Sequence, residues 1–134
     1  MALSPETAQV VVADDDLLFS SRISAALTAL GYRPVVARSE TALWDAMRAA
    51  PRAAIVNLAL RRFDAAEAIR GLKTDAATRG IPLLGFCGHR DVGRARAAKA
   101  AGCDAVTTNG VVAADLQRVL AALLESVRPP AGTA

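Results

Sequence analysis

The chain has 134 residues, of which 53% are hydrophobic and 4% aromatic. This length suits one domain, whose core must be built mainly from alanine, valine, leucine and isoleucine. A net charge of +3 does not by itself indicate a specific nucleic-acid partner. No apolar stretch reaches membrane-spanning length, no secretory pattern opens the chain, and the two cysteines make no disulfide framework. We therefore expect a soluble, cytoplasmic protein.

Five apolar segments alternate with five segments in which apolar residues recur at helical spacing. The apolar segments predict strands at residues 9–13, 32–37, 54–60, 81–86 and 105–107. The periodic segments predict helices at residues 17–30, 92–101 and 112–127, and two more that follow Ser39 and begin at Asp64. Gly31 and Gly102 are expected to end the first and fourth helices, and Ser39 and Asp91 to cap the second and fourth.

The strict alternation of strands and helices predicts a parallel sheet with helices on both faces. Right-handed crossovers fix most of the remaining topology. We expect a single domain at residues 8–127, preceded by a short lead-in at residues 1–7. The proline-rich residues 128–134 predict a frayed tail.

Polar side chains follow two of the predicted strands. Asp14, Asp15 and Asp16 come directly after the first strand, and Asn57 lies near the end of the third. The carboxyl ends of parallel strands meet at one edge of the sheet, where sites collect. Carboxylates repel phosphate and attract a hard cation such as Mg²⁺. Two interpretations stay open: Asp14 and Asp15 hold a cation, or the acids only cap the first helix and favour its positive end, a role expected of Asp16.

Over nearly its whole length the chain resembles the receiver domains of two-component response regulators. The runs that carry the resemblance are residues 12–16, 55–60 followed by Asp64, 82–88 and 101–110. They are similar to the family's acidic pair, phosphoacceptor strand, fourth-strand end and run ending in Lys-Pro. The resemblance implies a CheY-like, flavodoxin-like three-layer sandwich with five helices and a five-stranded parallel sheet of order 2-1-3-4-5.

The reactive residues of that family are mostly replaced here. Where the family phosphorylates an aspartate the chain has Asn57, on which no acyl phosphate can form. Asn109 stands at the family's lysine and Cys87 at its hydroxyl residue, so that only Asp14 and Asp15 persist. The two asparagines leave the pocket's charge sum unchanged and avoid a costly unpaired buried lysine. An engineered replacement of a natural aspartate would explain Asn57 alone. The resemblance implies a pseudo-receiver with weak or vestigial Mg²⁺ binding and no required cofactor.

Several residues are expected around this pocket. Arg61 and Arg62 enter beside it, and either could pair with an acid after the first strand; the alternative is two solvated loop arginines. His89 lies in the next loop along and is expected to be solvated. Arg94 belongs to a fourth helix that carries several basic residues, and Val106 stands where the family places its aromatic switch residue. We expect Arg94 and Val106 on a partner face.

The function expected from the sequence is that of a stand-alone receiver-like domain in phosphorelay signalling. It would act without phosphorylation, through a protein partner such as a histidine kinase or a downstream effector, and would not be an enzyme. The alternatives are a small Mg²⁺-dependent phosphatase or hydrolase that uses the acidic pair, and a ligand-sensing domain whose neutral pocket holds a small molecule. A hydrolase would need a nucleophile and a general acid, which neither asparagine supplies.

Overall fold

Five parallel strands form one sheet of order β2-β1-β3-β4-β5 in the computed structural model, which describes residues 8–127. The predicted order 2-1-3-4-5 and the alternation with five helices are confirmed. The strands are β1 (Gln9–Ala13), β2 (Arg33–Ala37), β3 (Ala53–Asn57), β4 (Leu83–Cys87) and β5 (Ala105–Thr108). The helices are α1 (Leu17–Ala29), α2 (Glu40–Arg48), α3 (Ala65–Thr74), α4 (Val92–Ala100) and α5 (Asn109–Ser126). The predicted lead-in and tail lie outside the described residues.

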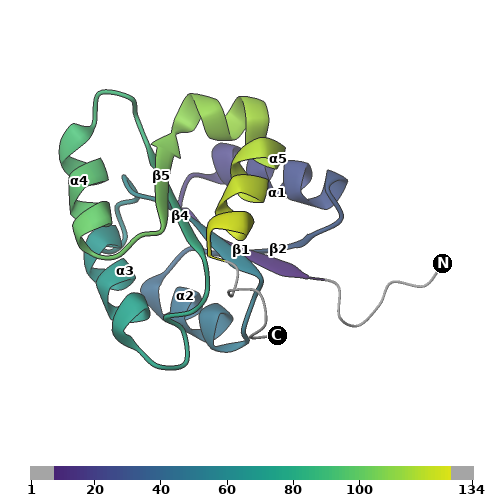
Figure 1. The fold of residues 1–134 in the computed structure, drawn as a ribbon. Coiled ribbons are helices and arrows are strands. Elements are labelled where there is room, and N and C mark those ends of the chain that lie inside the picture. The colour runs from purple at the N-terminus through teal and green to yellow at the C-terminus, as the bar shows by residue number, and fades with distance from the viewer. Residues whose placement is uncertain (1–7, 128–134) are drawn as a thin grey trace.

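The sheet separates two hydrophobic clusters, because successive side chains of a strand point to opposite faces. Val10 and Val12 of β1 pack with α1 and α5, whereas Val11 and Ala13 pack with α2, α3 and α4. Figure 1 shows this division, with α1 and α5 on one side of the sheet and the other three helices opposite. The core of a chain with few aromatic residues is thus built from aliphatic side chains on both faces. No helix in the part of the chain that the structure describes is long and apolar enough to cross a membrane.

Short polar side chains begin most of the helices. The Asp16 carboxylate accepts from the Phe19 N–H, and Ser39 and Asp64 cap α2 and α3 in the same way. Asp91 occupies the N-cap position of α4, as predicted. Its carboxylate makes no capping hydrogen bond, because it accepts instead from Arg94 Nη1 at 2.7 Å.

Two predicted boundaries differ from the structure for local reasons. The third strand ends at Asn57 and not at residue 60, because the Asn57 side chain accepts from the Ala59 N–H at 2.9 Å and turns the chain. The last helix begins at Asn109 and not at residue 112, because the Thr108 hydroxyl accepts from the Val111 N–H and caps it early. This helix is kinked at Asp115, where φ and ψ are −150° and 49°, and Figure 1 shows its first part turned against the rest.

An ion pair ties α3 to the opposite end of the sheet from the acidic residues. Lys73 Nζ lies 2.8 Å from Asp104 Oδ2, and the two side chains are only 13% and 19% exposed. Lys73 Nζ also donates to the carbonyl oxygen of Ile81, and Asp104 Oδ2 also accepts from the Leu83 N–H. One carboxylate oxygen therefore fixes the start of β4 and the end of α3 together.

Gly85 in β4 lies directly against Leu58, and this contact gives a testable prediction. A Cβ at position 85 would come within 2.9 Å of Leu58 Cδ2, and Leu58 is only 6% exposed. Gly85→Ala is therefore expected to lower the free energy of unfolding by about 1–2 kcal/mol, as overpacking does. Leu58→Ala should destabilise the Gly85→Ala variant less than it destabilises the parent. Gly80→Ala is the control: a Cβ there meets no atom within 4 Å, so its effect on stability should be close to zero. Chemical denaturation measures all four; additive effects of the two core changes would contradict the contact.

Candidate functional site

The carboxyl ends of β1 and β3 bring the acidic residues and Asn57 together. Ala13 and Val56 are partners in the register of these strands, so the residues that follow them, Asp14 and Asn57, are neighbours at the edge of the sheet. Asp15 comes next along the chain. The structure thus gathers the three residues around which the sequence predicted a pocket.

The Asn57 amide uses both of its polar atoms inside this site. Its Nδ2 donates to Asp14 Oδ1 at 2.9 Å, and its Oδ1 accepts from the Ala59 N–H at the same distance. A carboxylate at this position would lack the donor that Asp14 receives. The uncharged amide therefore links the neighbouring acid to the turn that follows β3, donating to the first and accepting from the second.

Asp14 is fully buried, and its two carboxylate oxygens differ in their surroundings. Oδ1 accepts from Asn57 Nδ2 and from the Asp16 N–H at 3.0 Å, whereas Oδ2 is buried with no hydrogen-bond partner among the described residues. Burial raises the pKa of the Asp14 carboxyl above its ordinary value, and the hydrogen bond from Asn57 opposes that rise. Asn57 thus stabilises the ionised form of Asp14, a form that burial of the carboxyl group disfavours.

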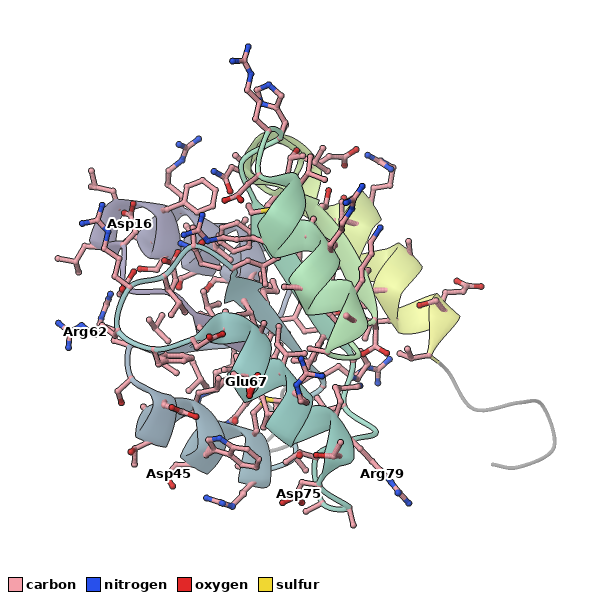
Figure 2. All side chains as sticks on the ribbon, turned by 90° about the vertical axis from the view of Figure 1, so that its left-hand side faces the viewer. Asp16, Asp45, Arg62, Glu67, Asp75 and Arg79 are labelled. Carbon is pink, nitrogen blue, oxygen red and sulfur yellow. The ribbon has the colours of Figure 1, made fainter. Side chains whose placement is uncertain are left out.

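Asp15 holds the loop between β3 and α3 through the backbone. Its Oδ2 accepts from the N–H of Arg61 at 2.7 Å and from that of Arg62 at 3.2 Å. Both arginine side chains are exposed, and within residues 8–127 neither forms an ion pair with an acid. Figure 2 shows Arg62 projecting outward on the same side as Asp16. Asp15 thus engages the backbone of these arginines and not their side chains, whose role in the pocket stays a prediction.

The other residues predicted for the pocket lie around it. Cys87 ends β4, is 3% exposed, and directs its thiol toward the carbonyl oxygen of Asp91 at 3.7 Å. Burial raises the pKa of this thiol, which disfavours a reactive thiolate. Asn109 is exposed in the first turn of α5. Neither side chain hydrogen-bonds to Asp14, Asp15 or Asn57 in the described part of the chain, and their role in the pocket stays a prediction.

The two residues predicted for a partner face lie on α4 and β5. Arg94 is exposed and paired with Asp91, and Val106 is partly buried against the cluster on the α2, α3 and α4 side. His89 is exposed in the loop before α4. These placements leave the partner face a prediction.

The residues present fit a metal ion poorly. Asp14 and Asp15 each have one oxygen engaged by N–H donors, which leaves one carboxylate oxygen of each for a cation. In residues 8–127 no group of three or more acids, histidines or cysteines is placed to hold a metal. Mg²⁺ takes six ligands and would have to keep most of its waters at such a site.

The buried Asp14 predicts a pH-dependent stability. Because its pKa is raised in the folded state, the folded protein holds the proton to higher pH, and stability falls as pH rises from about 3.9 through the folded value. Asp14→Asn keeps an acceptor for Asn57 and removes this titration, so at pH 8 the variant should be at least as stable as the parent. Asp14→Ala leaves two N–H donors without an acceptor and should lower the free energy of unfolding by about 1–2 kcal/mol. Thermal unfolding between pH 4 and 8 measures this; an Asp14→Asn variant with an unchanged pH profile would contradict it.

Backbone groups of this site were not predictable from residue types. The N–H groups of Ala59, Arg61 and Arg62 are the partners of Asn57 and Asp15, and any residue except proline supplies one. The only sequence signal was an asparagine at a strand end followed by a short turn.

Comparison with known proteins supports the fold. The sequence matches no protein-family model and no curated protein. The signal receiver domain of a signal transduction histidine kinase from Syntrophus aciditrophicus matches with a TM-score of 0.79 and 17% identity, covering 95% of this chain and 97% of that one. Chemotaxis response regulator CheY4 of Vibrio cholerae matches with a TM-score of 0.70 and 20% identity, covering 84% and 98%. NtrX from Brucella abortus matches with a TM-score of 0.80 and 21% identity, covering 90% of this chain but 27% of that chain. The fold is that of receiver domains.

Proposed function

We propose that this chain is a receiver-like domain of two-component signalling that works without phosphorylation and acts through a protein partner. The observation that carries the proposal is the Asn57 amide, whose nitrogen donates to Asp14 and whose oxygen accepts from Ala59. An amide is a poor nucleophile, and here both polar atoms are already engaged. The receiver fold supplies the setting, and the neighbours of known structure are named as signalling proteins.

The acids around Asn57 support the same proposal. One oxygen of Asp15 accepts from the loop after β3 and one oxygen of Asp14 accepts from the Asn57 amide, so each acid keeps only one oxygen for a metal ion. The proposed domain therefore requires no cofactor, and Mg²⁺ binds weakly through Asp14 and Asp15. A hydrolase would need a nucleophile beside these acids, and the only thiol at the adjoining strand end, Cys87, is buried.

The proposed partner is a histidine kinase or a downstream effector, reached through a surface that includes Arg94 and Val106. The proposed partner is a protein and not a specific nucleic acid. The exposed basic side chains of α4 favour a partner with acidic groups.

The test is incubation with acetyl phosphate, or with beryllofluoride, in the presence of Mg²⁺. Intact-mass measurement should detect no phosphoryl adduct, and ¹⁵N-NMR spectra should show no beryllofluoride-induced shifts beyond those of Mg²⁺ alone. A stable adduct, or a shift centred on Asn57, would overturn phosphorylation independence. A known receiver that retains its aspartate serves as the positive control for both reagents.

A further inference from the structure

A groove between α3 and α4 is a feature that the proposed function leaves unexplained. It has a volume of about 350 Å³. Its apolar lining comes from Leu58, Leu60, Phe63, Ala65, Ala66 and Ala97. Two polar residues, Asp64 and Arg94, complete the lining. Pockets that bind small groups begin at about 300 Å³, so this groove can hold one or two apolar side chains.

The groove exists because α4 presents alanines to α3. The sequence of α4 is Val-Gly-Arg-Ala-Arg-Ala-Ala-Lys-Ala, and Ala98 is its only buried residue. A helix that packs leucines against its neighbour would fill this space. Figure 2 faces the side on which α3 and α4 lie, with Glu67 labelled on α3. The small side chains of α4 leave the apolar atoms of Phe63 and Ala66 accessible between the helices.

The wall opposite α4 is fixed by the polar site described above. Leu58, Leu60 and Phe63 belong to the loop after β3, whose backbone is held by Asn57 and Asp15. Leu58 is further seated against Gly85 of β4. The groove is therefore formed before any ligand arrives, which lowers the ordering cost of binding.

The charge around the groove is positive on its α4 side. Residues 88–101 carry four cations and one acid, Asp91, whereas residues 64–74 carry two acids and two cations. Arg94 lines the groove and is paired with Asp91; in the described chain Arg90, Arg96 and Lys99 have no ion-pair partner. These four cations lie on or next to a short helix, and exposed charges interact over about 8 Å at physiological salt. Asp64 is the acid in the lining itself, so the net positive charge that would attract anionic groups lies along α4 and the loop before it.

We propose that the α3–α4 groove binds a segment of a protein partner that inserts an aliphatic or aromatic side chain and flanks it with acidic residues. This inference rests on the proposed function, since it names the surface and the chemistry of the partner. The apolar lining favours an apolar inserted side chain, and the positive charge of α4 favours acidic residues next to it in the partner segment. The groove shares Arg94 with the partner face predicted from sequence but lies on the α3 side of α4 and does not include Val106, so it extends that face toward α3.

The test uses three short peptides and ¹⁵N-labelled protein. The probe is acetyl-Glu-Leu-Phe-Asp-amide, with acetyl-Lys-Leu-Phe-Lys-amide and acetyl-Glu-Ser-Ser-Asp-amide as the charge-reversed and polar controls. The acidic apolar peptide should shift the amide signals of Leu58, Phe63, Ala66 and Ala97, and both controls should bind at least about tenfold more weakly. Equal binding of all three peptides, or shifts that centre elsewhere, would overturn the proposal.

Matched variants separate the groove from the rest of the surface. Ala97→Trp fills the groove from an exposed helical position, and Ala121→Trp makes the same change at an exposed position of α5. Ala97→Trp should weaken binding of the probe at least about tenfold, the effect of losing an anchor pocket, while Ala121→Trp leaves it unchanged. Asp15→Ala, which releases the groove wall without touching the lining, should also weaken binding. Unchanged binding in Ala97→Trp would contradict the groove as the site.

A nucleic acid is the alternative anionic partner for the groove, and a separate titration tests it. Oligo-dT added in place of the peptide should leave the groove signals unchanged. Groove shifts with a steep salt dependence would overturn the peptide assignment in favour of nucleic acid. Failure here is distinguishable from failure of the proposed function, because phosphoryl transfer to the chain is measured without any peptide.

Discussion

Asn57→Asp is expected to lower the free energy of unfolding by about 2–4 kcal/mol at pH 8 in the absence of divalent cations. The substitution removes the donor that Asn57 Nδ2 offers to the buried Asp14 Oδ1 and places a second carboxylate at that distance, 2.9 Å. Two carboxylates so close cannot both ionise without a large cost. The effect is measured by chemical denaturation in the presence of a chelator.

The pH dependence of this penalty has a definite sign. In the variant one of the two carboxyls holds its proton in the folded state to higher pH than in the unfolded state. The penalty is therefore absent below about pH 3.9, the ordinary unfolded value, and grows as pH rises toward the raised folded pKa. A variant as stable as the parent at pH 8 would contradict the Asn57–Asp14 contact.

Mg²⁺ should reverse the effect in this variant alone. Asp14, Asp15 and the introduced acid would then offer the oxygen ligands that the natural site lacks, and binding to the folded state raises its stability by mass action. Asn57→Ala also loses the hydrogen bond to Asp14 but adds no charge, so it is the matched control. It should be destabilised by about 1–2 kcal/mol and should respond to Mg²⁺ no more than the parent does. Equal responses of the two variants would show that the cation acts elsewhere.

Lys73→Met is expected to lower the free energy of unfolding by about 2–3 kcal/mol. The change leaves the Asp104 carboxylate, whose side chain is 19% exposed, without its cation, and leaves the Ile81 carbonyl without a donor. Arg70→Met is the control, since Arg70 and Glu67 are 3.5 Å apart and more than half exposed. That pair should be worth at most about 0.5 kcal/mol.

A double variant distinguishes loss of the ion pair from loss of packing. Asp104→Asn keeps an acceptor for the Leu83 N–H, so it should restore part of the stability lost in Lys73→Met. Strictly additive effects of the two substitutions, measured by denaturant unfolding, would indicate that the pair contributes no coupling energy.

The fold could be predicted because its signals are local and repeated. Apolar runs such as residues 9–13 alternate with helical periodicity five times, and this pattern leaves few topologies besides the parallel sheet. The acidic edge followed from the same pattern, since Asp14 comes directly after β1 and Asn57 is the last residue of β3. Ser39 and Asp16 were predicted as caps because short polar side chains before a helix have that mechanism.

The parts that could not be predicted depend on contacts between distant segments. Asp15 bonds to backbone N–H groups 46 and 47 residues away, and residue types do not encode such a pair. Asp91 was predicted to cap α4, but the nearby Arg94 competes for its carboxylate. The groove arises from the absence of large side chains on α4, and its volume depends on how closely α3 approaches. Nothing in the sequence distinguishes Ala97 from the many other alanines of the chain.

The division of the interior by the sheet has a consequence for how this protein can change. Among residues 8–127 the two clusters lie on opposite faces of the sheet, so a side chain enlarged on one face cannot use space on the other. Substitutions in the layer under α1 and α5 should therefore accumulate independently of those under α2, α3 and α4. An evolving lineage, or a designer, could rebuild the α1 and α5 layer while the surface that carries the groove is kept unchanged.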